Sequence, residues 1–349
     1  MPKRNIFYPK AMPEKPKLET VAKAAGVSTA TASQVMRGTG RISEATRKKV
    51  LAAAQKLHYV PDGRAAAMRS GENREIGFAI HQIANPFNAE VISGVSDLLE
   101  TEGYLVSVLD SRDNTDRQRR NLEAFIRSSR GGLLWVPAEE TEDSTFDLLA
   151  THDMSTVTFL RRSGKGRFDH VGIENAEATA TATTYLANLG HRRIAYFGGV
   201  AQSGVRSERI AGYEQVLQER GLGTPIIWDC MDDKLAGLDA MQALHAAHPD
   251  VTAVICNGDM VAIGACLGIT QMGLRPGKEI SVIGFDDIQD AAVATPPLTT
   301  MAVSPYQMGR KLARVVLDRI KDPQMPKAVS LVPAELVVRE TTGAPVSRA

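Results

Sequence analysis

Through residues 74–330, apolar runs of strand length alternate with segments in which apolar residues recur at helical spacing. The strand-like runs occupy residues 76–80, 105–109, 132–136, 194–197, 253–256 and 281–284. Helical patterns occupy residues 88–102 and 177–189. This alternation is typical of parallel β-sheets covered by helices, so it predicts an α/β architecture. Ligands of such sheets bind in the crevice beyond the carboxyl ends of the strands.

The length and composition allow a small domain in addition to this α/β part. At 349 residues the chain exceeds one ordinary domain, because domains usually span about 100–200 residues. Hydrophobic residues make up 43% and charged residues 23% of the chain, as in water-soluble globular proteins. No apolar run reaches the roughly 18 residues that a membrane span requires, and no apolar stretch follows the basic start as in a secretory signal. We therefore expect a cytoplasmic protein without membrane contact.

The three cysteines, Cys230, Cys256 and Cys266, are odd in number and show no CxxC spacing. This pattern disfavours both a disulfide framework and a zinc site. The enzyme motifs GxxxxGK[ST], HExxH and GxSxG are absent from the sequence. His245 and His248 lie on a predicted helix, where a place on the surface is the simpler interpretation. We expect no cofactor, no metal ion and no catalytic residues.

Charge is distributed unevenly along the chain. Residues 1–70 contain 14 lysines and arginines against four aspartates and glutamates, a net charge of +10. The whole chain has a net charge of only +1, so the remainder carries −9. A basic end joined to an acidic body is typical of a protein whose end faces a polyanion such as nucleic acid.

The basic end contains a helix, a glycine turn and a second helix. Small or apolar residues at helical spacing predict one helix over about residues 18–25. Gly26 permits the left-handed backbone that ends a helix, Val27 can fill the turn, and Ser28 is a good N-cap for a helix over about residues 29–37. A third helix follows Ser43 and closes a three-helix core. We interpret this segment as a helix-turn-helix.

On the second helix, Ala32, Val35 and Met36 can face the core. The opposite surface is then free to contact base edges in a major groove. The candidate DNA contacts of this domain are Thr29, Ala30, Thr31, Ser33, Gln34, Arg37, Arg47 and Tyr59. Two packed helices without a DNA-binding role are the alternative, and the charge asymmetry favours DNA.

Motifs throughout the chain agree in order and spacing with one known family. They are VAKAAGVSTATASQVMRG, ISEATRKKVLAAAQKLHYVP, DGRAAAMRSG, REIGFAI, ANPFNAEVISGVSDLLETEGY, HVGIENAEATATATTYLANLGHRRIAYFGG, TAVICNGDMVAIGA and ISVIGFDD. Through these motifs, about residues 17–343 resemble the lactose-repressor (LacI/GalR) family of bacterial transcriptional regulators. The resemblance implies an N-terminal all-α helix-turn-helix domain with a hinge helix. A two-lobed α/β domain with parallel sheets, like that of periplasmic sugar-binding proteins, would follow.

The resemblance also divides the chain into parts. It implies a basic tail at residues 1–16, a DNA-binding domain at 17–61, a hinge helix at 62–73, and an effector-binding and dimerisation domain at 74–343. Lobe one would comprise about residues 74–172 and 304–330, and lobe two about residues 173–303. Family members bind pseudo-palindromic operators as dimers, so a homodimer is implied. The final residues, VVRETTGAPVSRA, show no heptad run, which favours a dimer over a tetramer.

The resemblance also suggests how operator DNA is recognised. Thr29 and Ala30 occupy the positions that vary most with operator sequence in the family. A hydroxyl group and a small apolar side chain favour a thymine methyl over guanine. Gln34 stands where most members have an arginine, and glutamine pairs with adenine more readily than with guanine.

The hinge resembles the short helix that enters the minor groove when an operator is bound. Met68 stands where relatives place an intercalating leucine, so we expect it to wedge and kink the central base step. Ala65 would pack against the dimer mate or the groove floor. Arg64 is a candidate phosphate contact, as are Lys17 and Lys48. The alternative for Met68 is a linker residue without contacts.

Several residues at matching family positions follow strand ends, where an effector pocket is expected. Phe87 would stack against a sugar ring, and Asn85, Asp110, Arg209 and Asp286 would hydrogen-bond to its hydroxyl groups. A structural ion pair or a cap is the alternative for Arg209 and Asp286. Contact and structural roles are evenly weighted for Asp110.

Two further positions are ambiguous. Asp259 can contact the effector, cap the helix that follows it, or do both. Arg161 departs from the family, in which an aspartate at that position commonly meets a sugar hydroxyl. A cation there indicates an anionic effector, such as a sugar acid or a sugar phosphate, as an alternative to a neutral sugar.

Together these features predict a repressor of an operon for carbohydrate uptake or utilisation. It would bind double-stranded operator DNA as a homodimer and respond to a small effector, a sugar such as a disaccharide or a sugar derivative. Release from DNA and corepression both remain open, since either sign needs only unequal affinity for two states. A soluble sugar-binding protein without a DNA role is the alternative function.

Overall fold

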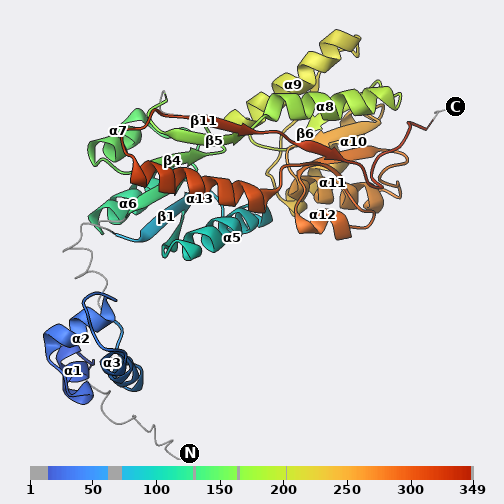
Figure 1. Cartoon of the computed structure of the whole chain (residues 1–349). Coiled ribbons are helices and arrows are strands. Elements are labelled where there is room, and N and C mark those ends of the chain that lie inside the picture. The colour runs from blue at the N-terminus through green and yellow to red at the C-terminus, as the bar shows by residue number, and fades with distance from the viewer. Residues whose placement is uncertain (1–14, 62–72, 129–130, 163–165, 202, 347–349) are drawn as a thin grey trace, which may run out of the picture. The chain divides into compact units, whose positions relative to one another are not determined.

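The computed structural model describes residues 15–61, 73–128, 131–162, 166–201 and 203–346. Contacts within the chain divide it into two compact units, Met1–Glu72 and Asn73–Ala349 (Figure 1). No helix in the described ranges is both long and apolar enough to span a membrane.

In its described residues, 15–61, the small unit contains three helices, as the sequence predicts. α1 spans Leu18–Ala25, α2 spans Thr29–Met36 and α3 spans Glu44–Lys56. Each helix contributes two buried side chains to the core, which consists of Val21, Ala22, Ala32, Val35, Val50 and Ala54. These side chains are small, so three short helices can approach closely and exclude water from their contact.

The large unit contains two six-stranded sheets, which define its two lobes (Figure 1). In lobe one the strand order is β11-β5-β4-β3-β1-β2, and every pair is parallel. Its strands are β1 (Glu75–Ile80), β2 (Leu105–Asp110), β3 (Gly132–Trp135), β4 (Thr156–Phe159), β5 (Asp169–Ile173) and β11 (Val329–Val332). The α/β architecture expected from the sequence is confirmed.

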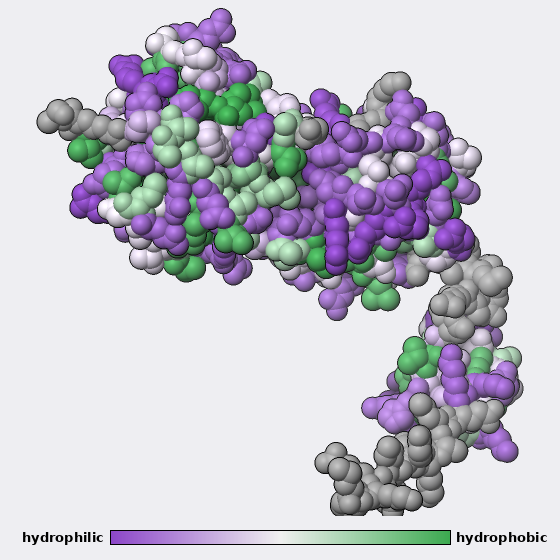
Figure 2. Space-filling model, turned by 180° about the vertical axis from the view of Figure 1, so that it is seen from behind, coloured by the Kyte–Doolittle hydropathy of each residue, from purple (hydrophilic) through white to green (hydrophobic). Residues whose placement is uncertain are grey.

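In lobe two the strand order is β12-β10-β9-β8-β6-β7. Its strands are β6 (Ile194–Phe197), β7 (Ile226–Trp228), β8 (Ala253–Cys256), β9 (Ser281–Asp286), β10 (Thr299–Ala302) and β12 (Glu335–Val337). β12 is antiparallel to β10, and the other pairs are parallel. Seen from behind, lobe two shows apolar areas on its surface, whereas lobe one is mainly hydrophilic there (Figure 2).

Helices pack on both faces of the lobe-one sheet. Leu134 of β3 belongs to the buried cluster shared with α5 and α13, whereas its neighbours Leu133 and Trp135 join the cluster of α6 and α7. Neighbouring strand residues point to opposite faces, so an uninterrupted apolar run serves both helix layers. The helices of this lobe are α5 (Pro86–Thr101), α6 (Thr115–Arg127), α7 (Asp143–Thr151) and α13 (Pro305–Lys321).

Lobe two has two pairs of packed helices, α8 with α9 and α10 with α11. The two pairs lie on opposite sides of the sheet in Figure 1. The helices of this lobe are α8 (Asn175–Asn188), α9 (Gly204–Arg220), α10 (Lys234–Ala247), α11 (Asp259–Gln271) and α12 (Gln289–Val293).

The chain passes between the lobes three times, after β5, after β10 and between β11 and β12. The last crossing adds to the expected division of the lobes: β11 completes the lobe-one sheet up to Val332, and the residues after it return to lobe two. There the hydroxyl of Thr341 donates to the carbonyl of Val282 at 2.7 Å. This crossing was not predicted, because β11 and β12 are short and have no buried residue that would mark them as strands.

Two glycines bring α5 and α13 into backbone contact. A Cβ atom at Gly94 would lie 2.0 Å from the carbonyl oxygen of Tyr306, and one at Gly309 would lie 2.1 Å from that of Val91. We therefore expect Gly309→Ala to force the helices apart and lower the free energy of unfolding by about 1–3 kcal/mol.

Urea denaturation of the full chain measures this effect. Gly204→Ala is the control, because no heavy atom lies within 4 Å of the added Cβ and its stability should be unchanged or slightly raised. Equal midpoints for Gly309→Ala and the wild type would refute the close packing.

Candidate functional site

The turn between α1 and α2 is built from three consecutive residue types with separate tasks. Gly26 has a φ of 67°, in the left-handed region, and its N–H closes the end of α1. Val27 packs against the core of the small unit. The hydroxyl oxygen of Ser28 accepts a hydrogen bond from the Thr31 N–H at 3.1 Å and so caps α2. This local chemistry fixes the crossing of the two helices.

The side chains of α2 divide as the sequence indicates. Thr29 and Ala30 of α2 are exposed, as is Arg37 directly after it, and Ser33 and Gln34 are partly exposed. The accessible surface of α2 therefore carries hydroxyl, methyl, amide and guanidinium groups, which are the groups that read base edges and phosphates.

Two other candidate DNA contacts, Thr31 and Tyr59, have structural duties in the small unit. The hydroxyl groups of Thr31 and Ser28 are hydrogen-bonded at 2.9 Å. Tyr59 packs against the core cluster, and Arg47 is partly exposed on α3. The predicted hinge contacts Arg64, Ala65 and Met68 lie outside the described residues.

A pocket of about 510 Å³ lies between the two lobes at the carboxyl ends of their strands. Lobe one contributes the last residue of β2 and residues after β1, β2 and β4, namely His81, Gln82, Ile83, Ala84, Asn85, Asp110, Arg112, Asp113 and Arg161. Lobe two contributes residues after β6, β7 and β8, namely Gly199, Val200, Ser203, Met231, Asp232, Asp233 and Asn257. The lining thus combines carboxylates, amides and arginines with a few aliphatic side chains.

On the lobe-one wall, Arg161 is held by two carboxylates. Its Nη2 atom donates to Asp113 at 3.0 Å, and its Nε atom lies 2.9 Å from Glu139. Burial would raise the pKa of Asp113, but the hydrogen bonds and charge of Arg161 outweigh it and lower that pKa. Burial, followed by the charge of Arg161, lowers the pKa of His81 to about 4. His81 is therefore uncharged at neutral pH.

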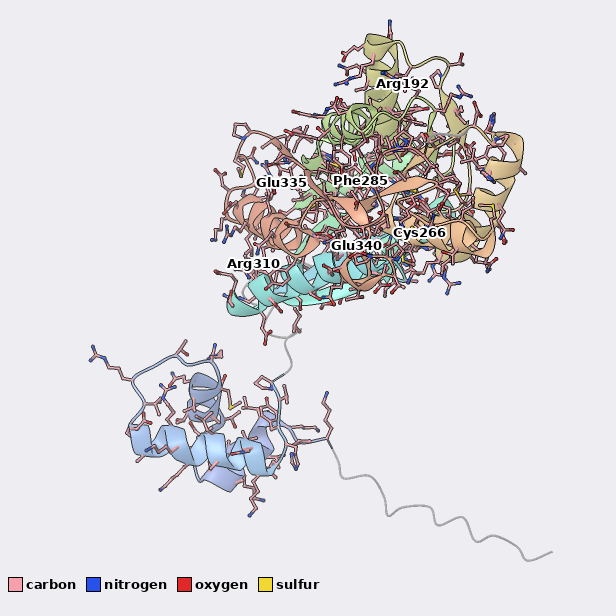
Figure 3. The ribbon with its side chains drawn as sticks, turned by 90° about the vertical axis from the view of Figure 1, so that its right-hand side faces the viewer. Arg192, Cys266, Phe285, Arg310, Glu335 and Glu340 are labelled. Atoms are coloured by element: carbon pink, nitrogen blue, oxygen red, sulfur yellow. The ribbon has the colours of Figure 1, made fainter. Side chains whose placement is uncertain are left out.

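On the lobe-two side, a hydrogen-bonded chain runs behind the pocket. The Nε atom of Arg209 donates to Asn175 Oδ1 at 2.9 Å, and its Nη1 atom donates to the carbonyl of Asn257. Asn257 in turn donates to Asp232 at 2.6 Å. The guanidinium of Arg209 also lies over the ring of Phe285, with its Cζ atom 3.5 Å from the ring centroid. Phe285, labelled in Figure 3, is only 1% exposed.

Two more aspartates are buried on the lobe-two side. Asp259, at the start of α11, accepts hydrogen bonds from the Thr300 hydroxyl at 2.6 Å and the Ile288 N–H at 2.9 Å. Burial raises its pKa to about 7. Burial also raises the pKa of Asp286, against the opposing charge of Arg209, and the neighbouring carboxylates raise it further.

Two family models match the chain. Residues 17–62 match the model described as bacterial regulatory proteins, lacI family. Residues 183–342 match the periplasmic binding protein-like domain. The HTH-type transcriptional repressor PurR of Vibrio campbellii is 31% identical to this chain over 93% of its residues and 98% of the relative. The chain belongs to the lacI family.

Further relatives agree with this membership. The maltose regulon regulatory protein MalI of Escherichia coli is 28% identical to this lacI-family protein over 92% of the chain and 97% of the relative. The Lac repressor dimer solved with operator and the anti-inducer ONPF has 25% identity and a TM-score of 0.83, with 95% of this chain and 100% of that chain covered. The CelR–cellobiose complex has 28% identity and a TM-score of 0.70, with 93% and 99% covered. The predicted fold class is confirmed.

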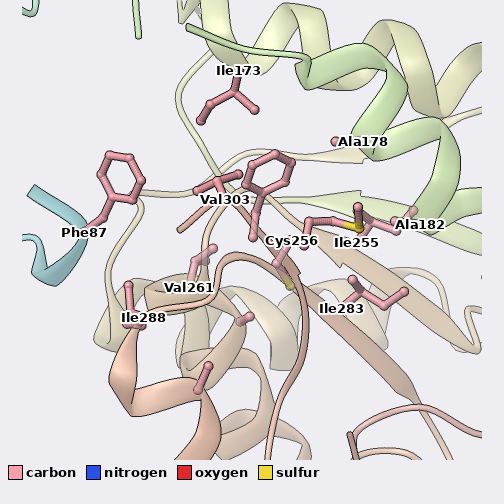
Figure 4. Packing of buried hydrophobic residues seen from close by; sticks show 14 of the residues in the cluster. Phe87, Ile173, Ala178, Ala182, Ile255, Cys256, Val261, Ile283, Ile288 and Val303 are labelled. Atoms are coloured by element: carbon pink, nitrogen blue, oxygen red, sulfur yellow. The ribbon is translucent and has the colours of Figure 1, made fainter. Parts of the chain in front are cut away.

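The pocket of this lacI-family protein contains some of the predicted effector contacts and not others. Asn85, Asp110 and Arg161 line it. Phe87, expected to stack on a sugar ring, is instead 4% exposed and stacks on Phe159, with ring centroids 6.2 Å apart. Figure 4 shows Phe87 at the margin of the buried cluster that contains Ile173, Ile288 and Val303.

The remaining predicted contacts, Arg209, Asp259 and Asp286, do not belong to the lining of this pocket. Sequence reasoning missed four polar residues that do: His81, Asp113, Asp232 and Asn257. Each follows a strand closely. A search for polar residues after every strand-like run would have found His81, Asp113 and Asn257, but not Asp232, which follows the unrecognised strand β7. In the described part of the chain, no three His, Cys, Asp or Glu side chains are grouped to hold a metal ion.

Asp259→Asn should reduce the pH dependence of stability. The folded-state pKa of Asp259 is about 7 and its ordinary value is 3.8, so the folded protein holds a proton that the unfolded chain has lost between these values. The free energy of unfolding therefore falls as the pH rises through this interval, by up to about 1.4 kcal/mol per pH unit from this group.

Urea titrations between about pH 4 and pH 7 measure this slope. In Asp259→Asn the amide can still accept from Ile288 and donate to Thr300, so the decline should be shallower than in the wild type. Identical slopes for the two proteins would show that Asp259 is ionised throughout.

Proposed function

We propose that this lacI-family protein is a transcriptional repressor that binds a pseudo-palindromic operator as a homodimer and is switched by a sugar. The observation that carries the proposal is the combination, in one chain, of a basic helix-turn-helix unit and a polar pocket between two lobes. PurR is named as a repressor, the Lac repressor dimer was solved on its operator, and CelR was solved with cellobiose. This lacI-family protein would act in the cytoplasm, where bacterial operators lie.

The DNA-reading residues would be those on the accessible side of α2. Thr29 and Ala30 are exposed at its first turn, so they can approach base edges when the helix enters a major groove. Gln34, Ser33 and Arg37 would extend the contact along the groove and its backbone. In the hinge, Met68 would wedge into the minor groove.

Apolar side chains on lobe two offer a surface for the second copy. Leu235 on α10 is 70% exposed and Val293 on α12 is 78% exposed. The two helices are joined by the ion pair between Lys234 and Asp290, 2.6 Å apart, which places these side chains in one region of the lobe. Burial of such residues against an identical surface would stabilise a dimer.

The effector would bind among the polar groups of the pocket. Its hydroxyl groups would meet Asn85, Asp110 and Asn257, and its ring would lie against Ile83 and Met231, since proteins bind sugars with convergent polar groups beside an apolar surface. The relatives named above are regulatory proteins rather than enzymes, which supports regulation over catalysis.

Binding to genomic fragments tests the proposal. The purified chain is mixed with fragmented genomic DNA at physiological salt, and bound fragments are sequenced before and after addition of neutral sugars, sugar acids or sugar phosphates. A recurrent palindromic site whose occupancy changes with one ligand supports the repressor. A chain that binds a sugar but no DNA site would instead be a sugar-binding protein without a DNA role.

Gln34→Arg should change which base is preferred at one symmetric pair of operator positions. Arginine donates two hydrogen bonds to guanine, whereas glutamine pairs with adenine, and each such contact gives about 1–3 kcal/mol of discrimination. Selection from a randomised operator library measures the preference. Lys48→Gln is the control, because loss of a phosphate contact weakens all sequences alike. An unaltered preference in Gln34→Arg would exclude base reading by Gln34.

Arg209→Lys should impair the effector response without loss of operator binding. Lysine keeps the charge but cannot hold Asn175 and the Asn257 carbonyl together while lying flat on Phe285. We expect effector affinity to fall roughly tenfold or more, which corresponds to about 1.4 kcal/mol. The response is measured as the fraction of operator bound at increasing effector concentrations. Arg193→Lys, at an exposed ion pair with Asp250, is the control. A normal response in Arg209→Lys contradicts this role.

A further inference from the structure

The Arg161 side chain reaches the pocket, but most of its N–H groups contact other residues of the protein. Its Nε atom lies 2.9 Å from Glu139, and its Nη1 atom donates to the Pro137 carbonyl at 3.0 Å. Both terminal nitrogens also donate to the carboxylate of Asp113. A guanidinium carries five N–H groups; three of them donate to Asp113 and Pro137, and Nε lies beside Glu139 as an ion pair, so one N–H on Nη2 remains for a ligand.

The carboxylates that hold Arg161 are themselves fixed. Arg112 and Asp113 both have left-handed backbone, with φ values of 51° and 54°. Asp113 also accepts a hydrogen bond from the Glu139 N–H at 3.0 Å. The loops after β2, β3 and β4 are thereby joined through one ionic cluster. Because the Arg161 side chain is only 14% exposed, its release would leave charges without partners in a poorly solvated place.

All residues that line the pocket are described, and each of the two arginines among them has a carboxylate partner. Arg161 is paired twice, and Arg112 lies 3.6 Å from Asp110. Four aspartates but only two arginines line the pocket. The cluster of Asp113, Glu139 and Arg161 itself carries one net negative charge when its members are ionised.

The other walls add no positive charge. His81 is uncharged at neutral pH, since its pKa is about 4. Asp233 caps α10 by accepting from the Ala236 N–H at 2.8 Å. Asp232 is held by Asn257 at 2.6 Å. A phosphate or carboxylate placed here would face carboxylates on both sides and would lose its hydration without gaining a cation.

We propose that Arg161, restrained by Asp113 and Glu139, is a specificity-determining residue that makes the pocket select uncharged polyhydroxylated ligands and reject sugar acids and sugar phosphates. This inference rests on the proposed function, because it names the ligand class of the same pocket. The free N–H of Arg161 donates to one ligand hydroxyl, and the Asp113 carboxylate accepts from another. The arginine therefore acts as part of a fixed polar wall, and its charge is not available to an anion.

Matched ligand sets test the proposal on the full chain. The probes are glucose, gluconate, glucose 6-phosphate and glucosamine, together with cellobiose and cellobionate. Calorimetry and the shift in melting temperature report binding to the wild type, Glu139→Gln, Asp113→Asn/Glu139→Gln, Arg161→Gln and the control Arg162→Gln. Arg162 is exposed and does not line this pocket. Melting without ligand and far-ultraviolet circular dichroism establish that each variant is folded.

The wild type and Arg162→Gln should bind a neutral member of a set and not its anionic counterpart. In Asp113→Asn/Glu139→Gln, Arg161 is released, and the ratio of anion to neutral affinity should rise at least roughly tenfold, an effect that added salt diminishes. Glu139→Gln should raise the same ratio by a smaller factor, because Arg161 keeps its pair with Asp113. This single variant serves as the test if the double variant fails to fold. Arg161→Gln should weaken the neutral ligand without creating affinity for an anion.

Three results would overturn the proposal: an anionic probe that binds the wild type as tightly as its neutral counterpart, glucosamine that binds more tightly than glucose, or a ratio that Glu139→Gln and the double variant leave unchanged. Operator binding of the same proteins is measured separately. If the wild type binds no operator, the proposed repressor is contradicted. If it binds an operator but the ratio of anion to neutral affinity is unchanged in the variants, only the role of Arg161 is contradicted.

Discussion

Three crossings of the chain between the lobes bring the carboxyl ends of the parallel strands of two sheets toward each other, and the pocket depends on this arrangement. Parallel strands place all their carboxyl ends at one edge, so the residues after β1, β2 and β4 converge with those after β6, β7 and β8. The third crossing, between β11 and β12, ties the end of the chain into both sheets. A relative movement of the lobes must therefore be accommodated at these crossings, and it would change the distance between the pocket walls.

Three arginines of the large unit are held by carboxylates, amides or backbone carbonyls, and they serve different ends. Arg319 and Asp169 are each 2% exposed and lie 2.7 Å apart, which fixes α13 to the start of β5 far from the pocket. Arg209 connects helices α8 and α9 to the loop after β8. Arg161 connects three loops on the opposite wall. An unpaired charge in any of these places would carry a large desolvation cost, so each arginine fixes the backbone segments whose carboxylates or carbonyls it meets.

The small unit was predictable almost residue by residue. Gly26, Ser28 and Ser43 act on their own neighbours in the chain, through a left-handed backbone at the glycine and side-chain caps at the serines. The strand-like runs of the large unit were recognised where they are long and apolar. Six strands were missed: β4, β5 and β10, which are buried but include threonine, aspartate or histidine, and the short, partly exposed β7, β11 and β12. Their place is set by pairing with other strands, several of them distant in the sequence.

The pocket was predicted in location but only partly in its residues. Asn85, Asp110 and Arg161, chosen for their position near a strand end, line the pocket, whereas the ring of Phe87, chosen in the same way, packs on Phe159. The sequence by itself determined the helix-turn-helix, the α/β architecture and the edge at which a ligand would bind, because these follow from contacts between near neighbours and from strand direction. Only the tertiary structure decided the charge state of that edge. From the sequence, Arg161 is expected to offer its charge to a ligand. In the fold, Asp113 and Glu139 from two other loops pair with it and balance its charge.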